Sequence, residues 1–130
     1  MSDTIQVEIA PGELVDKITI LEIKKERIAD AGKLKNVNLE WETLTGALDA
    51  NVEKSVALSD LTASLKSVNE ALWEIEDDIR DCERASDFGD RFVELARAVY
   101  VTNDKRAALK RDINELLGSR MIEEKSYAAY

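Results

Sequence analysis

The feature that most constrains the fold is a heptad pattern of apolar side chains between Asp60 and Gly118. In its first part, apolar side chains recur at alternating steps of four and three residues, at Leu61, Leu65, Val68, Leu72, Ile75, Ile79 and Cys82. A second part, from Phe92 to Leu116, has the same rhythm. Such spacing places the apolar side chains of each part on one stripe of a helix. Since the turn residues 87–90 separate the two parts, the sequence predicts a long antiparallel helical hairpin.

Two polar residues, Thr102 and Arg106, interrupt the second stripe where apolar side chains are expected. Folding the hairpin about residues 88–89 brings residues 72–76 level with about 101–106, which predicts Glu76 as the buried partner of Arg106. We therefore expect a polar cluster in the seam, made of Arg106, Thr102, Glu76, Trp73, Lys25 and Asn103. This cluster is either a structural ion pair or a site where the guanidinium binds an anion.

The N-terminal residues follow a different period. Apolar and polar side chains alternate over residues 4–9, with Ile5, Val7 and Ile9 on one side, and this predicts a short strand. Pro11 and Gly12 end it. A lone strand needs a partner for its backbone groups. Either residues 121–127 or a second copy of the chain would supply that partner.

Apolar spacing and cap residues divide the remainder into helices. The expected helices cover about 13–31, 38–51, 60–86 and 90–118. Together they predict a single helical domain over residues 1–118, followed by a partly ordered tail over 119–130. The predicted fold is all-α, a four-helix arrangement dominated by the long hairpin, with one short N-terminal strand.

The charge and the composition limit the classes of partner that the chain could bind. The net charge of −9 opposes nucleic acid and anionic membrane surfaces, because a phosphate backbone requires a basic footprint. No apolar run approaches the length of a membrane span, and no charged-then-apolar leader opens the chain, so we expect a cytoplasmic protein. The hairpin is long enough to leave part of its seam uncovered, which favours a homodimer that completes a bundle.

The residue types also limit catalysis. The chain has no His, which removes His-based nucleophilic chemistry and most zinc or haem ligation. Its one cysteine, Cys82, lies on the apolar stripe and is expected to be a core residue. The leading hypothesis is a non-enzymatic interaction or scaffold module without a cofactor, homodimeric and binding a bacterial protein partner, in a pathway that the sequence does not name.

Paired carboxylates support an alternative, enzymatic hypothesis. Helical nucleotide pyrophosphohydrolases bind Mg²⁺ or Mn²⁺ through two Glu-x-x-Glu/Asp pairs on neighbouring helices. The pairs Glu13–Asp16 and Glu74–Asp77 have that spacing, and Asp81 extends the second pair along its helix face. A minor alternative is a small-anion site at the Arg106 seam like that of all-helical chorismate mutase, which binds a dicarboxylate through buried Arg and Lys.

Two runs of the sequence are the most distinctive. They are PGELVDKITILEIK, beginning at Pro11, and LWEIEDDIR, beginning at Leu72, with its continuation YVTNDKRAALKRDINELLG from Tyr100. Together they resemble a family of small bacterial proteins of unknown function. The resemblance covers most of the chain outside residues 32–60, and it implies no activity, cofactor or catalytic residue.

Overall fold

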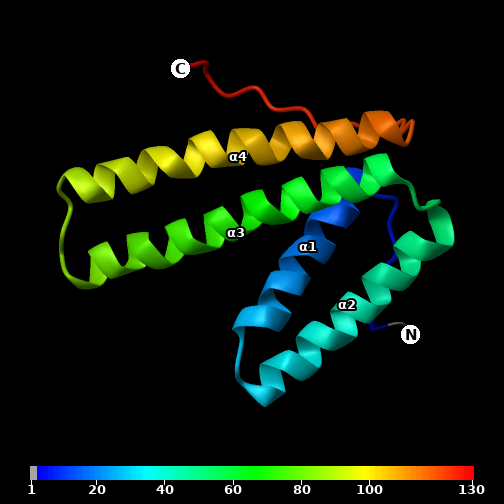
Figure 1. Ribbon diagram of the computed structural model, residues 1–130, viewed down its shortest axis with the longest axis horizontal. Helices are drawn as coiled ribbons and strands as arrows, with labels where there is room; N and C mark the ends of the chain where they lie inside the picture. Colours follow the sequence, from blue (N-terminus) through cyan, green and yellow to red (C-terminus); the bar gives the residue numbers. More distant parts are fainter. Residues whose placement is uncertain (1–2) are drawn as a thin grey trace.

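The computed structural model describes residues 3–130 and contains four helices in that range. These are α1 (Pro11–Arg27), α2 (Ala31–Asn51), α3 (Val56–Arg84) and α4 (Asp90–Leu116). The fold is all-α. α3 and α4 lie side by side and are joined by residues 85–89, while α1 and α2 pack below one end of this pair (Figure 1). None of the helices in residues 3–130 is both long enough and apolar enough to cross a membrane.

The predicted N-terminal strand is wrong. Residues 4–9 have no regular structure, and the side chains of Ile5 and Val7 are exposed. The alternating pattern fails to form a strand because no second strand exists in residues 3–130 to pair with its backbone groups. The C-terminal residues, one of the two expected partners, run back along α4 (Figure 1).

Local caps move the helix boundaries away from the predicted ones. α1 ends at Arg27, and α2 begins at Ala31 because the Asp30 carboxylate accepts a hydrogen bond from the Gly32 N–H at 3.1 Å. Gly32 therefore lies inside α2 and does not end α1. α3 begins at Val56, four residues earlier than expected, because the Ser55 hydroxyl accepts from the Leu58 N–H at 3.1 Å.

α1 is the central helix, since it packs against each of the other three. The core lies where α1 meets α3 and α4, and its buried cluster consists of Val15, Leu58, Leu65 and Ile113. Of the predicted α3 stripe, Leu65 and Cys82 are fully buried, whereas Leu72, Ile75 and Ile79 are only half-buried. The part of α3 and α4 that extends past α1 and α2 thus has a two-helix seam without a third layer (Figure 1).

Candidate functional site

A buried ion pair between α1 and α4 is the centre of the site. Asp16 is 1% exposed. The Arg106 guanidinium donates from Nε to Asp16 Oδ1 at 2.9 Å and from Nη2 to Oδ2 at 2.5 Å. Asn69 on α3 adds a third hydrogen bond, from Nδ2 to Asp16 Oδ1 at 2.9 Å, and the same amide donates to Thr19 Oγ1 at 3.0 Å. One carboxylate therefore joins three helices.

The two partners hold each other in their charged forms. Burial raises the pKa of Asp16, but hydrogen bonds from Arg106 and Asn69 outweigh burial and hold that pKa below its usual value. The hydrogen bond to Asp16 raises the pKa of Arg106. Both groups are consequently ionised at neutral pH, and the pair is a bidentate, charge-assisted contact.

Lys110 lies one turn further along α4 and is almost fully buried. Its Nζ is 2.7 Å from Glu13 Oε2 on α1 and 2.8 Å from Glu123 Oε2 in the C-terminal segment. Burial lowers the pKa of Lys110, whereas the hydrogen bonds to Glu123 and Glu13 raise it, and the net change is upward. The ammonium group is thus charged and shared between two carboxylates.

A close approach of α1 and α4 sets this register. The Gly12 N–H donates to Asn114 Oδ1 at 2.7 Å. A Cβ at residue 12 would lie 2.3 Å from the Lys110 carbonyl oxygen, so only glycine allows the backbones to come this close. This contact places Glu13 and Asp16 on α1 opposite Lys110 and Arg106 on α4.

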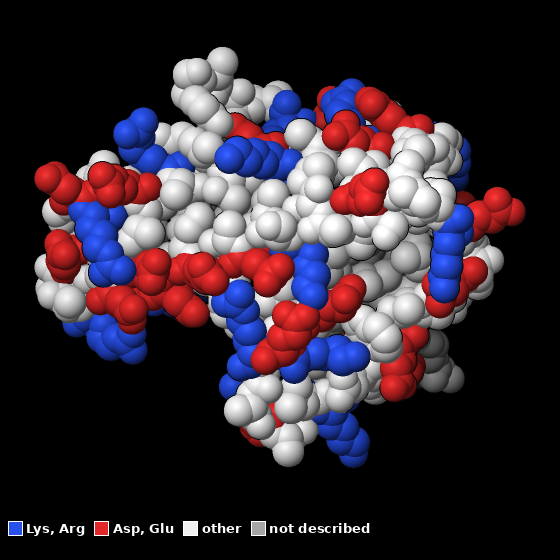
Figure 2. All heavy atoms as spheres, viewed as in Figure 1, with Lys and Arg blue, Asp and Glu red and all other residues white. Residues whose placement is uncertain are grey.

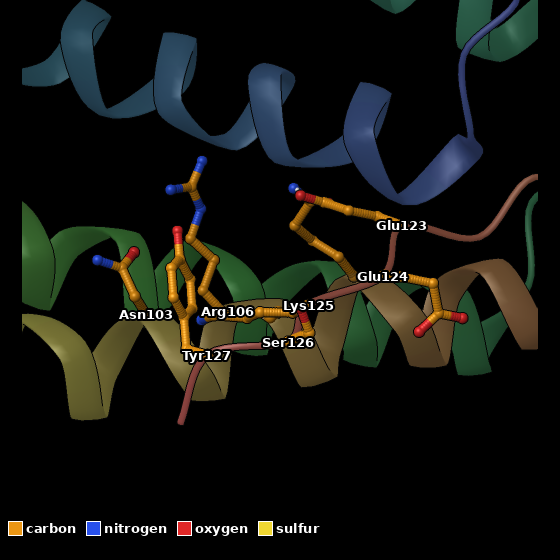
Figure 3. A pocket seen from close by; sticks show the side chains of 9 residues that line it. Asn103, Arg106, Glu123, Glu124, Lys125, Ser126 and Tyr127 are labelled. Atoms are coloured by element: carbon orange, nitrogen blue, oxygen red, sulfur yellow. Dashed lines mark ion pairs between the residues drawn. The ribbon is translucent and has the colours of Figure 1, made fainter. Parts of the chain in front are cut away.

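The C-terminal segment covers the site and leaves a cavity beneath it. The cavity has a volume of about 600 Å³ and lies between α4 and the segment. In Figure 3 the Arg106 side chain points towards α1. The Glu123 carboxylate is the one that pairs with the Lys110 ammonium. Asn103 and Tyr127 lie at the Arg106 end of the cavity (Figure 3). The cavity is therefore lined by charged groups of both signs and by uncharged hydrogen-bonding groups.

The expected seam cluster is only partly assembled. Glu76 does not pair with Arg106; it is exposed and lies 3.4 Å from Arg80 on its own helix. Trp73 lies beside Arg27, whose guanidinium carbon is 5.9 Å from the ring centroid. Thr102 and Asn103 are half-buried on α4. The predicted partner of Arg106 was wrong because α1 crosses the seam and supplies Asp16.

Lys25 is not in this seam either. Its side chain is exposed, and its Nζ lies 3.6 Å from the centroid of the Trp41 ring on α2. This is a cation–π contact between α1 and α2. The inward position that its helical spacing predicted is wrong, because the buried arc of α1 is centred on Val15, Asp16, Ile18 and Thr19.

The carboxylates of the metal hypothesis are not brought together. Glu13 and Asp16 are paired with cations of α4, as described above. On α3, Glu74 pairs with Arg27 at 3.4 Å, Asp81 pairs with Arg84, and Asp77 is exposed. In residues 3–130 no group of three or more Asp, Glu, Cys or His side chains is arranged to hold a metal ion.

Several residues of the site were missed from the sequence, namely Gly12, Thr19, Lys110, Asn114 and Glu123. One signal was available for α1. Asp16 and Thr19 sit among the apolar positions Val15 and Ile18, just as Thr102 and Arg106 interrupt the stripe of α4. Polar interruptions on two helices indicate a shared buried contact. No such local signal marks Glu123, which reaches the site from the C-terminal segment.

Comparison with known families agrees with the resemblance noted in the sequence. Residues 5–130 match the model of the family of unknown function DUF6165. The chain belongs to this family. No curated protein and no solved structure matches it. The site residues Gly12, Glu13, Asp16, Arg106 and Lys110 all lie within the two runs that carry the resemblance.

Proposed function

We propose that this member of the DUF6165 family is a non-enzymatic protein-interaction module that pairs with a second copy of itself. The observation that carries the proposal is an excess of surface. The chain exposes 9159 Å², about a third more than the roughly 6,900 Å² expected for a compact monomer of 14.6 kDa. That surplus exceeds the area of about 800 Å² that each partner buries in a typical specific interface.

Apolar side chains lie on the part of the molecule that lacks a third layer. Three of them form what we call the projecting patch: Phe88, Val93 and Val101, all exposed. On α4, Val93 and Val101 are eight residues apart and so share one face. Figure 2 shows uncharged atoms along this part of α3 and α4, with acidic side chains gathered at its lower edge. A second copy that covers this patch would give the seam the layer it lacks.

The mass of the protein in solution tests the proposal. Light scattering coupled to size-exclusion chromatography should give about twice the single-chain mass of 14.6 kDa at micromolar concentration. The double variant Val93→Glu, Val101→Glu should elute with the mass of one chain, because two carboxylates would be buried in the interface without partners.

A matched control comes from α3. Val56 is 79% exposed but lies at the start of α3, away from the projecting patch, so Val56→Glu should leave the mass unchanged. A single-chain mass for the unmodified protein would refute self-association. A dimer that survives both changes on α4 but not Val56→Glu would refute the projecting patch as the interface.

A second candidate function is a small-anion site at Arg106 and Lys110. One observation favours it: Lys110 holds a carboxylate that comes from the C-terminal segment and not from the helical core. Titration with a small carboxylate, followed through the backbone amide signals of Ala107 and Lys110, tests this function. The metal-dependent hydrolase has no comparable support, since its carboxylates are separated.

A further inference from the structure

Glu123 is held in the site far more weakly than the other groups there. Its side chain is 64% exposed, and residues 120–130 are all exposed. The other contacts of the segment are also at the surface: Arg120 pairs with Glu8, Glu124 with Arg111 and Lys125 with Asp104, and the Tyr130 hydroxyl donates to Asp104. Exposed ion pairs contribute little because water and salt screen them. The carboxylate of Glu123 can therefore leave Lys110 without disturbing the core.

The groups that would remain are suited to a ligand. Arg106 uses Nε and Nη2 for Asp16, and its Nη1 bonds to no acceptor in residues 3–130. The Asn103 amide on α4 lies beside Arg106 (Figure 3) and makes no hydrogen bond within residues 3–130.

The charge balance selects the kind of ligand. Without Glu123, the two cations Arg106 and Lys110 face two fixed carboxylates, Asp16 and Glu13. The other charged groups that line the cavity, Lys125 and Glu124, are each paired with a side chain of α4. A singly charged carboxylate would replace the charge of Glu123 one for one. A phosphate monoester carries about −1.5 to −2 at neutral pH and would bring excess negative charge beside Glu13.

We propose that the site formed by Lys110, Arg106 and Asn103 on α4 binds a small monocarboxylic acid with a further polar group, and that Glu123 is its internal competitor. The ligand carboxylate takes the place of Glu123 on Lys110, its polar group reaches Arg106 Nη1 and Asn103, and the C-terminal segment is released. This inference rests on the small-anion function proposed above. It adds the ligand class and the competition.

The test uses the full-length chain, sodium lactate as the probe, and two matched variants at constant ionic strength. Glu123→Gln removes the competing carboxylate, whereas Glu124→Gln removes its neighbour, whose pair with Arg111 is made outside the contact with Lys110. Backbone ¹H–¹⁵N spectra report lactate binding at Ala107 and Lys110. The {¹H}–¹⁵N nuclear Overhauser effect reports the mobility of residues 121–127.

We expect lactate to bind Glu123→Gln about tenfold more tightly than the unmodified protein. This factor corresponds to a Glu123 carboxylate that occupies the site about 90% of the time, which leaves about a tenth of the unmodified protein open to the ligand. Glu124→Gln should bind like the unmodified protein. At saturation, residues 121–127 of the unmodified protein should become mobile on the picosecond–nanosecond timescale.

Each other outcome refutes a distinct statement. If lactate shifts no signal near Lys110 in Glu123→Gln, the small-anion site itself does not exist. Equal affinity in all three proteins would leave the site in place but refute the competition by Glu123. Tighter binding of inorganic phosphate than of lactate to Glu123→Gln would refute the monocarboxylate assignment.

Discussion

The Asp16–Arg106 pair makes a quantitative prediction about stability. In Arg106→Met the side chain still packs, but the Asp16 carboxylate keeps only the Asn69 amide as a hydrogen-bond partner and stays 1% exposed. Breaking a buried pair in this way costs about 3–5 kcal/mol. Domains of this size have a total unfolding free energy of about 5–15 kcal/mol, so the variant should lose a large share of its stability.

Removing the charge of Asp16 should lower the free energy of unfolding by less than removing that of Arg106. In Asp16→Asn the stranded group is Arg106, whose side chain is 30% exposed and can reach water. We expect a loss of about 1–3 kcal/mol. In the double variant no buried charge is left unpaired, so it should be more stable than Arg106→Met alone. The coupling energy of the two changes should then be about 2–3 kcal/mol.

Urea denaturation of the unmodified protein, both single variants and the double variant measures this cycle. The exposed pair of Glu76 and Arg80 provides a matched control on one helix. Its own cycle, Glu76→Gln with Arg80→Met, should give a coupling below about 0.5 kcal/mol. An equally small coupling for Asp16 and Arg106 would refute the buried pair.

Two further predictions concern α1. Gly12→Ala should lower the free energy of unfolding by about 3 kcal/mol, because the added Cβ would overlap the Lys110 carbonyl oxygen. The control is Gly46→Ala on α2, where the added Cβ has no atom within 4 Å, and it should raise the free energy of unfolding by about 1 kcal/mol. Urea denaturation measures both values. Because the folded-state pKa of Asp16 is lowered, its contribution to stability is present above its usual pKa and is lost as the pH falls through the lowered value. Unfolding free energies measured between about pH 5 and pH 2 should therefore fall more steeply for the unmodified protein than for Asp16→Asn; equal slopes would contradict this.

The helical class of the fold could be predicted because it depends on local spacing. The heptad steps predict helices through Leu65 and Cys82, and both side chains are buried. Helix caps are also local features, but several Ser and Asp residues near a helix boundary have the side chain of an N-cap. Ser55 caps α3, although Ser59 and Asp60 fit the same pattern. The strand over residues 4–9 failed because a strand depends on a distant partner that its own alternation does not reveal.

The site could be predicted only in part for a related reason. Arg106 stood out because a charged residue interrupts an apolar stripe, and it is indeed paired at a buried position. Its partner depends on how α1 crosses α3 and α4, which the spacing within a hairpin does not encode. Glu13 and Asp16 were chosen for a metal site by their spacing, and they are the carboxylates that neutralise Lys110 and Arg106. The family match confirms that the chain belongs to a family of unknown function, whereas the two motifs as its signature and a bacterial origin stay predictions.

The central position of α1 has a consequence for the order of events during synthesis. Asp16 and Arg106 are 90 residues apart in the sequence, so Arg106 on α4 is synthesised long after Asp16 on α1. At about 5–20 residues per second, α1 waits roughly 5–20 s before α4 emerges to cover it. During that interval Val15 lacks its α4 neighbour Ile113 and Asp16 lacks Arg106, so we expect the nascent N-terminal half to bind chaperones. α4, which is synthesised after the other three helices, thus completes the burial of α1.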